Sequence, residues 1–119
     1  MNEDYLIKSD HVNWLIPFSH YPVYCKSYFN NAECVNDTYN IRMAKFLDYF
    51  HEIGVNIYFG AHIHQYRRTK PINRKGEVGK FKENSHKNGV TYSEIEDSII
   101  YVIEGAAGNS DFMELKGGN

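Results

Sequence analysis

Several features that would place a protein in a special class are absent from this 119-residue sequence. No run of apolar residues approaches the roughly 18 that a transmembrane helix needs, so we expect no membrane partner. The polar and acidic residues 1–10 lack the basic start and apolar run of a signal peptide. Acidic and basic residues nearly cancel, with a formal net charge of -2 and a pI near 6.3. This balance gives no reason to expect nucleic acid as a partner.

Cysteine is also scarce, and the sequence has no internal repeat and no second domain. The two cysteines, Cys25 and Cys34, lie close together in a stretch rich in Tyr, Asn and Asp. A surface disulfide and two free thiols are both consistent with this placement. Asn36 begins an Asn-Asp-Thr triplet, an N-glycosylation acceptor that agrees with an oxidising compartment.

The sequence does contain enough apolar residues to build one core. Hydrophobic residues make up 42% of the chain and aromatic residues 15%, so we expect one globular domain over residues 1–119. Short apolar runs at residues 14–19, 55–60 and 99–103 predict buried strands, although Pro17 removes a hydrogen-bond donor from the first. Residues 38–53 carry apolar side chains at helical spacing, and Gly54 follows where a helix would stop.

The order strand, helix, strand predicts an α/β fold with a parallel pair of strands. Such a connection almost always joins parallel neighbours whose carboxyl ends lie at the same edge of the sheet. Open α/β sheets bind their ligands at that edge. Three histidines follow the predicted strands there: His20 ends the first run, and His62 and His64 follow the second.

The His62-x-His64 pair is the sharpest chemical feature. Two imidazoles two residues apart at a strand end would project to the same side. Their spacing suits two metal ions about 3.5 to 4 Å apart, each bound by one imidazole. Polar side chains that only close the sheet edge are the alternative. The other histidines carry less weight: His51 lies near the predicted helix end, where it favours the helix dipole, and His11 and His86 lie in polar stretches.

The region from residue 65 to residue 87 carries most of the positive charge, with eight Lys or Arg residues against two Asp or Glu. Its glycines and asparagines predict a solvated loop or an irregular hairpin. A basic stretch beside His64 could attract a phosphate ester, or it could simply be solvated. Residues 105–109, GAAGN, could bring backbone amides close to an anion or form a tight structural turn.

Three blocks of the sequence form recognisable motifs. Residues 14–25, WLIPFSHYPVYC, combine a tryptophan, an apolar strand and His-x-Pro-x-Tyr. Residues 60–68, GAHIHQYRR, contain His-x-His followed by Tyr and Arg, and residues 100–109, IYVIEGAAGN, end a strand in a small-residue turn. In this order the blocks resemble those of purple acid phosphatases, which belong to the calcineurin-like metallophosphoesterase superfamily.

The resemblance implies an α/β fold that forms the C-terminal part of a four-layer metallophosphoesterase α/β sandwich. It also implies a binuclear metal centre of iron with zinc, manganese or a second iron. His20 and His62 would bind the divalent ion, His64 would bind ferric iron, and Tyr66 would be a packing residue beside the site. The implied activity is hydrolysis of phosphate monoesters at acid pH by a secreted or lumenal protein.

The sequence also departs from the family pattern. The acidic ligand blocks, Asp-x-Gly, Gly-Asp-x-x-Tyr and Gly-Asn-His-Glu, would precede His20, and residues 1–19 contain none of them. We therefore expect a partial catalytic domain that supplies only histidine ligands, needs a missing N-terminal half as its partner and is inactive alone. Cys25 and Cys34 resemble the paired cysteines of some members, which implies a disulfide in an exported parent. A phosphodiesterase of the same fold and a non-catalytic metal-binding or structural remnant are the alternatives.

Overall fold

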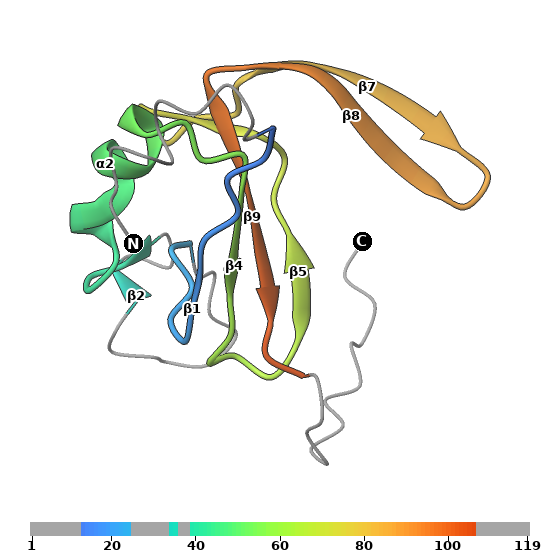
Figure 1. The fold of residues 1–119 in the computed structure, drawn as a ribbon. Coiled ribbons are helices and arrows are strands. Elements are labelled where there is room, and N and C mark those ends of the chain that lie inside the picture. The colour runs from blue at the N-terminus through green and yellow to red at the C-terminus, as the bar shows by residue number, and fades with distance from the viewer. Residues whose placement is uncertain (1–12, 25–33, 36–38, 107–119) are drawn as a thin grey trace.

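The apolar runs of the sequence assemble into one sheet (Figure 1). The computed structural model describes residues 13–24, 34–35 and 39–106, without the side chains of residues 34, 35 and 39. The main path of the sheet has the order β1-β4-β9-β5. Its strands are β1 (Phe18–Ser19), β4 (Ile57–Gly60), β9 (Ser98–Glu104) and β5 (Tyr66–Arg68), and β6 (Ile72–Asn73) also pairs with β9. Together with the one short α-helix among the described residues, this is a mixed α/β fold.

The predicted parallel pairing is confirmed. β1 runs parallel to β4 with Phe18 opposite Phe59, and β4 runs parallel to β9. β1 is shorter than the predicted strand because Pro17 has no amide hydrogen to donate. The chain before it still follows β4, since Asn56 N donates to Leu15 O at 3.0 Å and Phe59 N donates to Pro17 O at 3.1 Å. The carboxyl ends of β1 and β4 therefore meet at one edge.

The predicted helix over residues 38–53 is wrong at its beginning. In its place lie β3 (Tyr39–Asn40), which pairs with β2 (Cys34–Val35), the 3-10 turn η1 (Ala44–Phe46) and the helix α2 (Leu47–Glu52). Asn40 is buried, and its side-chain oxygen accepts a bond from Arg42 N at 2.9 Å, an interaction that competes with a helical start. Gly54 has a φ of 76° and ends the helix as predicted. None of the described helices is long and apolar enough to cross a bilayer.

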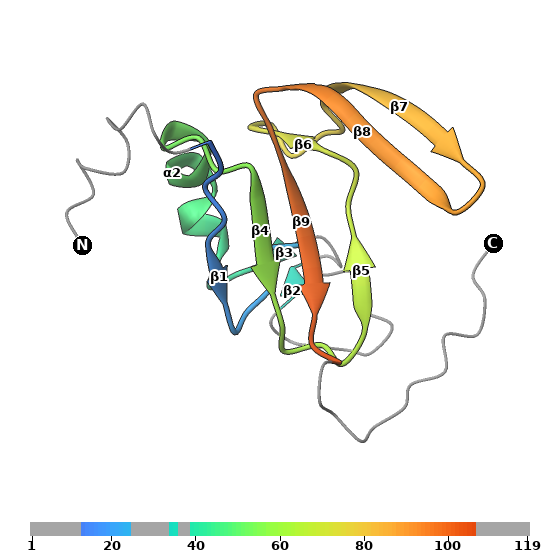
Figure 2. The same cartoon turned by 45° about the vertical axis from the view of Figure 1, so that its right-hand side comes forward.

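The basic region is more regular than predicted. After β5 and β6 it forms the antiparallel hairpin of β7 (Lys80–His86) and β8 (Gly89–Glu96), so the hairpin alternative is correct and the loop alternative is wrong. The hairpin projects beyond the sheet in both views (Figures 1 and 2). Two of its carboxylates are paired with lysines: Glu83 with Lys70 at 3.2 Å and Glu94 with Lys82.

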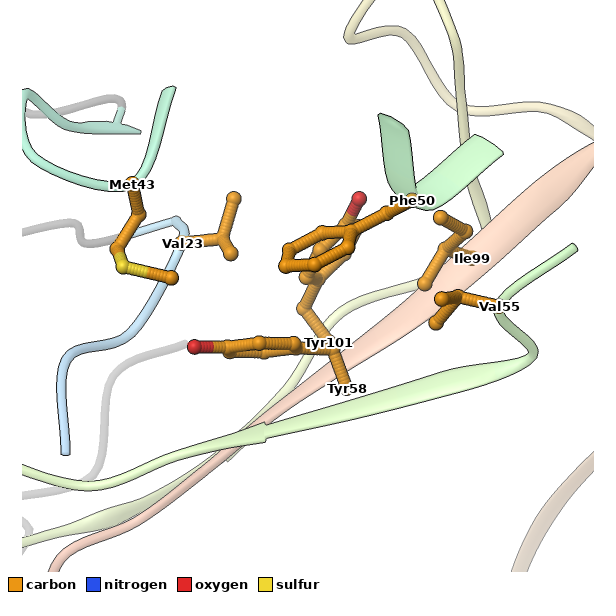
Figure 3. Close-up of a cluster of buried hydrophobic side chains, with 7 residues drawn as sticks. All are labelled: Val23, Met43, Phe50, Val55, Tyr58, Ile99 and Tyr101. Atoms are coloured by element: carbon orange, nitrogen blue, oxygen red, sulfur yellow. The ribbon is translucent and has the colours of Figure 1, made fainter. Parts of the chain in front are cut away.

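The core lies between α2 and one face of the sheet (Figure 3). Tyr58 of β4 is 1% exposed, and its ring centroid lies 5.2 Å from that of Phe50 on α2. The buried cluster contains Val23, Met43, Phe50, Val55, Tyr58, Ile99 and Tyr101. Burying this face removes enough apolar surface from water to hold the short helix on the sheet.

The opposite face of the sheet carries exposed apolar side chains. Phe18 and Phe59, which are opposite each other in the register, are 84% and 38% exposed. Trp14 and Ile16, just before β1, are 63% and 44% exposed. Parallel sheets normally have both faces covered, so this exposed face is unusual for the pairing that the strands adopt.

Candidate functional site

Two of the three predicted histidines meet at the edge where β1 and β4 end. His20 follows β1 directly, and His62 lies two residues beyond β4. Their closest ring nitrogens, His20 Nε2 and His62 Nδ1, are 3.0 Å apart, and their ring centroids are 5.0 Å apart. His20 is exposed and His62 is half-buried, so an exogenous ligand can reach both rings. The prediction that these two residues share an edge is confirmed.

The hydroxyl groups of Tyr58 and Ser19 hold the turn that carries His20 in place. Tyr58 OH donates to Tyr21 O at 2.8 Å, and the single Ser19 Oγ proton can go either to the same carbonyl, 3.0 Å away, or to the Tyr58 hydroxyl, which it also contacts. Burial raises the pKa of Tyr58, and the hydrogen bond with Ser19 partly opposes this. The Tyr58 hydroxyl therefore stays protonated and available as a donor. Ala61 N donates to His20 O at 3.1 Å and joins the turn to the end of β4.

The segment that carries His62 and His64 is a tight turn rather than a strand end. His62 has a φ of 61°, which is the left-handed region and costs roughly 1–2 kcal/mol for a residue with a side chain. Ile63 N donates to Ala61 O and Gln65 N donates to Ile63 O, both at 2.7 Å. The expectation of two histidines on one side of a strand is therefore wrong. The chain has to reverse here because β5 runs antiparallel to β9, whereas β4 runs parallel to it.

Two glycines allow the turns at this edge to approach closely. A Cβ built on Gly60 would lie 2.5 Å from Pro22 Cα, in the turn that follows His20. A Cβ built on Gly105, just after β9, would overlap the carbonyl group of Ile63 between the two histidines. Side chains at these positions would push the turns apart, so the two glycines set the distance between the histidine-bearing segments.

Tyr21 and Arg42 are site residues that the sequence reasoning missed. The Tyr21 ring centroid lies 5.0 Å from that of His20 and 5.0 Å from that of His62. Arg42 Nη1 donates to Tyr21 OH at 3.2 Å, which holds a guanidinium group beside the histidine pair. Arg42 reaches this place because Asn40 N donates to Val23 O at 2.8 Å and so ties the two segments together. No local pattern in the sequence signals this contact, because the residues are far apart along the chain.

The two imidazoles fit as ligands of one metal ion. Metal–nitrogen distances of 2.0–2.1 Å in a tetrahedral site separate two ligand nitrogens by about 3.4 Å. The observed 3.0 Å between His20 Nε2 and His62 Nδ1 needs only a small widening to reach that value. Among the described side chains, no group of three or more His, Cys, Asp or Glu residues could hold a metal ion. His64 is exposed and does not join the pair as a third ligand, so its ligand role stays a prediction.

The remaining predicted residues stay predictions for different reasons. Cys25, Asn36 and the side chain of Cys34 lie outside the described residues, so the disulfide and the glycosylation site stay predictions. Tyr66 is 55% exposed in this chain, so its packing beside the site stays a prediction.

His51 has an environment that the helix-dipole argument did not anticipate. It is buried in the last turn of α2, with Nδ1 3.7 Å from Asp97 Oδ1. Burial lowers the pKa of His51, and the negative charge of Asp97 partly opposes this effect. His86 is exposed on the hairpin as predicted, with Nε2 2.9 Å from Thr91 Oγ1. His11 lies outside the described residues.

Comparison with known proteins links this chain to a phosphatase. The chain is 29% identical over 108 residues to an acid phosphatase from Aspergillus ficuum, and the match covers 87% of this chain but 16% of that relative. Because the match covers 87% of this chain, the three predicted ligand histidines, His20, His62 and His64, all lie within it. No family model matches the chain. The similarity supports a phosphatase-like relationship, and the chain corresponds to less than a fifth of the relative's length.

Proposed function

We propose that the chain is the histidine-bearing part of a metal-dependent phosphate monoester hydrolase of the purple acid phosphatase kind. The observation that carries the proposal is the 3.0 Å approach of His20 Nε2 to His62 Nδ1 at the joined carboxyl ends of parallel strands. Ligand sites of open α/β sheets lie at this edge. The similarity to an acid phosphatase over most of the chain supports the same activity.

Each residue at the edge has a role in the proposed reaction. His20 and His62 would hold a divalent ion through Nε2 and Nδ1, and a bound ion would polarise the phosphoryl oxygen. Arg42 adds a fixed positive charge, and guanidinium groups bind phosphate oxygens through two parallel hydrogen bonds. Tyr21 orients Arg42 through its hydroxyl group and holds the His62 ring with its aromatic face. His64 is proposed as a ligand of a second, ferric ion.

In this proposal the chain supplies only part of the catalytic domain. A two-metal centre needs carboxylate oxygens to offset the repulsion between cations, and three neutral imidazoles offset none of it. The acidic ligands would come from a missing N-terminal half, with which this chain would form the four-layer sandwich. The exposed apolar face of the sheet around Phe18 and Phe59 is the surface that a second sheet would cover. The short share of the relative that this chain matches agrees with this proposal.

Other properties are proposed by resemblance alone. The second metal would be zinc, manganese or iron, and the protein would be secreted or lumenal. Cys25 and Cys34 would form a disulfide, and Asn36 would be glycosylated. Mass spectrometry of protein made in an oxidising compartment, under non-reducing conditions and before deglycosylation, would test both modifications.

Zinc titration of the chain tests the proposed site directly. We expect Zn²⁺ to shift the ring resonances of His20 and His62 in the NMR spectrum and to bind with an affinity that falls as the pH is lowered from about 8 to about 5, because a protonated imidazole cannot ligate. His62→Ala should weaken binding by roughly tenfold or more. The control is His86→Ala, which removes an exposed histidine on the hairpin and should leave the zinc affinity unchanged.

The same variants separate the proposal from its rivals. Equal zinc affinity in His62→Ala and the wild-type chain would refute the ligand assignment. Purified chain that hydrolyses a phosphate monoester without any added segment would refute the proposed incompleteness. A full-length protein that binds zinc through these histidines but hydrolyses no phosphate ester would favour a non-catalytic metal-binding protein.

A further inference from the structure

A pocket of about 640 Å³ lies between β5 and the turn of the β7–β8 hairpin. β5 is the edge strand of the sheet, so its outer side faces this pocket rather than another strand. The pocket is lined by Tyr66, Arg67, Arg68, Asn88, Gly89 and Val90. The described lining therefore offers the guanidinium group of Arg68, a phenol and a carboxamide, and it contains no Asp or Glu residue.

The guanidinium group of Arg68 is held in place by partners that do not neutralise it. Its Nη2 donates to Val90 O at 3.4 Å, and its Cζ lies 5.1 Å from the centroid of the Tyr92 ring. Neither partner carries a negative charge. A guanidinium has five N–H donors, so donors remain for a ligand after the bond to Val90 is made. The side chain is thus oriented at the rim of the pocket with its charge intact.

Two of the three acidic residues of the hairpin are paired with lysines, and the third, Glu96, ends β8 opposite Lys80, away from the turn that lines the pocket. Glu83 is paired with Lys70 and Glu94 is paired with Lys82. These pairs balance charge along the body of the hairpin and leave the pocket at its turn positive. Gly89 adds room, because a Cβ built there would meet no atom within 4 Å. The basic region thus contains two lysines that are paired with carboxylates, Lys70 and Lys82, and a pocket at which Arg68 has no acidic partner among the described residues.

We propose that this pocket binds a second oxyanion, the additional phosphate group of a substrate that carries more than one. This substrate assignment rests on the proposed function, whereas oxyanion binding by the pocket does not. Arginine forks match phosphate oxygens in geometry as well as in charge. Chain geometry limits the distance to His64: the Cα of Tyr66, two residues further along, lies within about 7 Å of that of His64, and the Cα of Arg68 lies within about 14 Å. A bisphosphate ester with one phosphate group at His64 can extend into the pocket over this range.

The first experiment uses the metal-free chain and inorganic pyrophosphate at constant ionic strength. We expect the amide resonances of residues 66–68 and 88–90 to shift on titration, and Arg68→Gln to weaken binding by roughly tenfold or more. Arg68→Lys keeps the charge but loses the fork, and should give an intermediate affinity. The matched control is Arg74→Gln, which removes the same charge from an exposed position outside the pocket and should change the affinity by less than about twofold.

If Arg68→Gln and Arg74→Gln weaken pyrophosphate binding equally, the proposed binding pocket is wrong, because the binding would then reflect only the overall charge of the region. Retention of binding in His62→Ala would show that the pocket acts independently of the histidines, whether or not they bind metal. Loss of pyrophosphate binding in His62→Ala would refute the claim that the pocket binds an oxyanion independently of the histidines.

The second experiment tests the substrate class with the zinc-loaded chain. A sugar bisphosphate should bind roughly tenfold more tightly than the corresponding monophosphate, and Arg68→Gln should abolish the difference. Equal affinities of the wild-type chain for the two esters would overturn the substrate assignment. Inorganic phosphate should bind no more tightly than the monophosphate. If inorganic phosphate binds more tightly than the bisphosphate, the pocket is a site for the free ion and the substrate assignment is wrong.

Discussion

Replacing Gly60 with alanine places one methyl group where the two histidine-bearing turns touch. The added Cβ would lie 2.5 Å from Pro22 Cα and 2.9 Å from Pro22 N. Carbon atoms in contact prefer separations of about 3.5–4.0 Å, so the turn must move by about 1 Å. Pro22 is fully buried and the clashing atoms are mostly backbone, so no side-chain rotation can relieve the contact. The expected loss in the free energy of unfolding is about 1–3 kcal/mol.

The same movement should separate the candidate ligands. A displacement of about 1 Å would widen the 3.0 Å distance between His20 Nε2 and His62 Nδ1 beyond the roughly 3.4 Å that one metal ion requires. We expect zinc affinity to fall by about 10- to 100-fold, the range observed when groups that orient metal-binding histidines are altered. Urea denaturation measures the stability, NOEs between the two imidazole rings report their approach, and calorimetry measures the affinity.

Gly54→Ala is the control for a general loss of stability. Gly54 has a φ of 76° and nothing lies within 4 Å of an added Cβ, so the substitution strains the backbone without a clash. Its cost should be about 1–2 kcal/mol, with zinc affinity unchanged. If Gly60→Ala keeps the ring NOEs and wild-type zinc affinity, the close approach at Pro22 does not position the histidines and the reasoning is wrong.

Three further substitutions test other parts of the structure. Tyr58→Phe removes the hydroxyl that donates to Tyr21 O and should lower the free energy of unfolding by about 1 kcal/mol in urea denaturation, whereas an unchanged value would contradict the role given to this bond. Because burial lowers the pKa of His51 against the opposing charge of Asp97, the unfolded chain takes up this proton at higher pH than the folded chain. Stability should therefore fall as the pH drops below about 6.5, and His51→Leu should flatten this dependence in melting curves; an unaltered slope would exclude His51 as its source. Gly105→Ala should destabilise the chain and weaken zinc binding together, and a change in only one of the two would argue against the contact with the histidine turn.

Local patterns in the sequence were sufficient for the central strands and their common edge. The apolar runs near Phe18, Phe59 and Ile100 predicted three strands, and the helical spacing between the first two predicted the parallel pairing of β1 with β4; the parallel pairing of β4 with β9 was found only in the structure. The meeting of His20 and His62 followed from the pairing of β1 with β4, because parallel neighbours end at the same edge. The spacing of the apolar residues and the order of the predicted elements are sufficient for this inference, and no long-range contact has to be known.

Other features depend on contacts between residues that are far apart in the sequence. The helix lost its first turns because the buried Asn40 bonds to Val23, and His62 left the expected strand geometry because the chain reverses into an antiparallel β5. The position of Arg42 beside the histidines and the pocket between Arg68 and the hairpin arise in the same way. Composition and spacing determined which chemistry the chain carries, whereas only tertiary packing decided which of those groups meet, since hydrogen bonds and close contacts across the fold override local propensity.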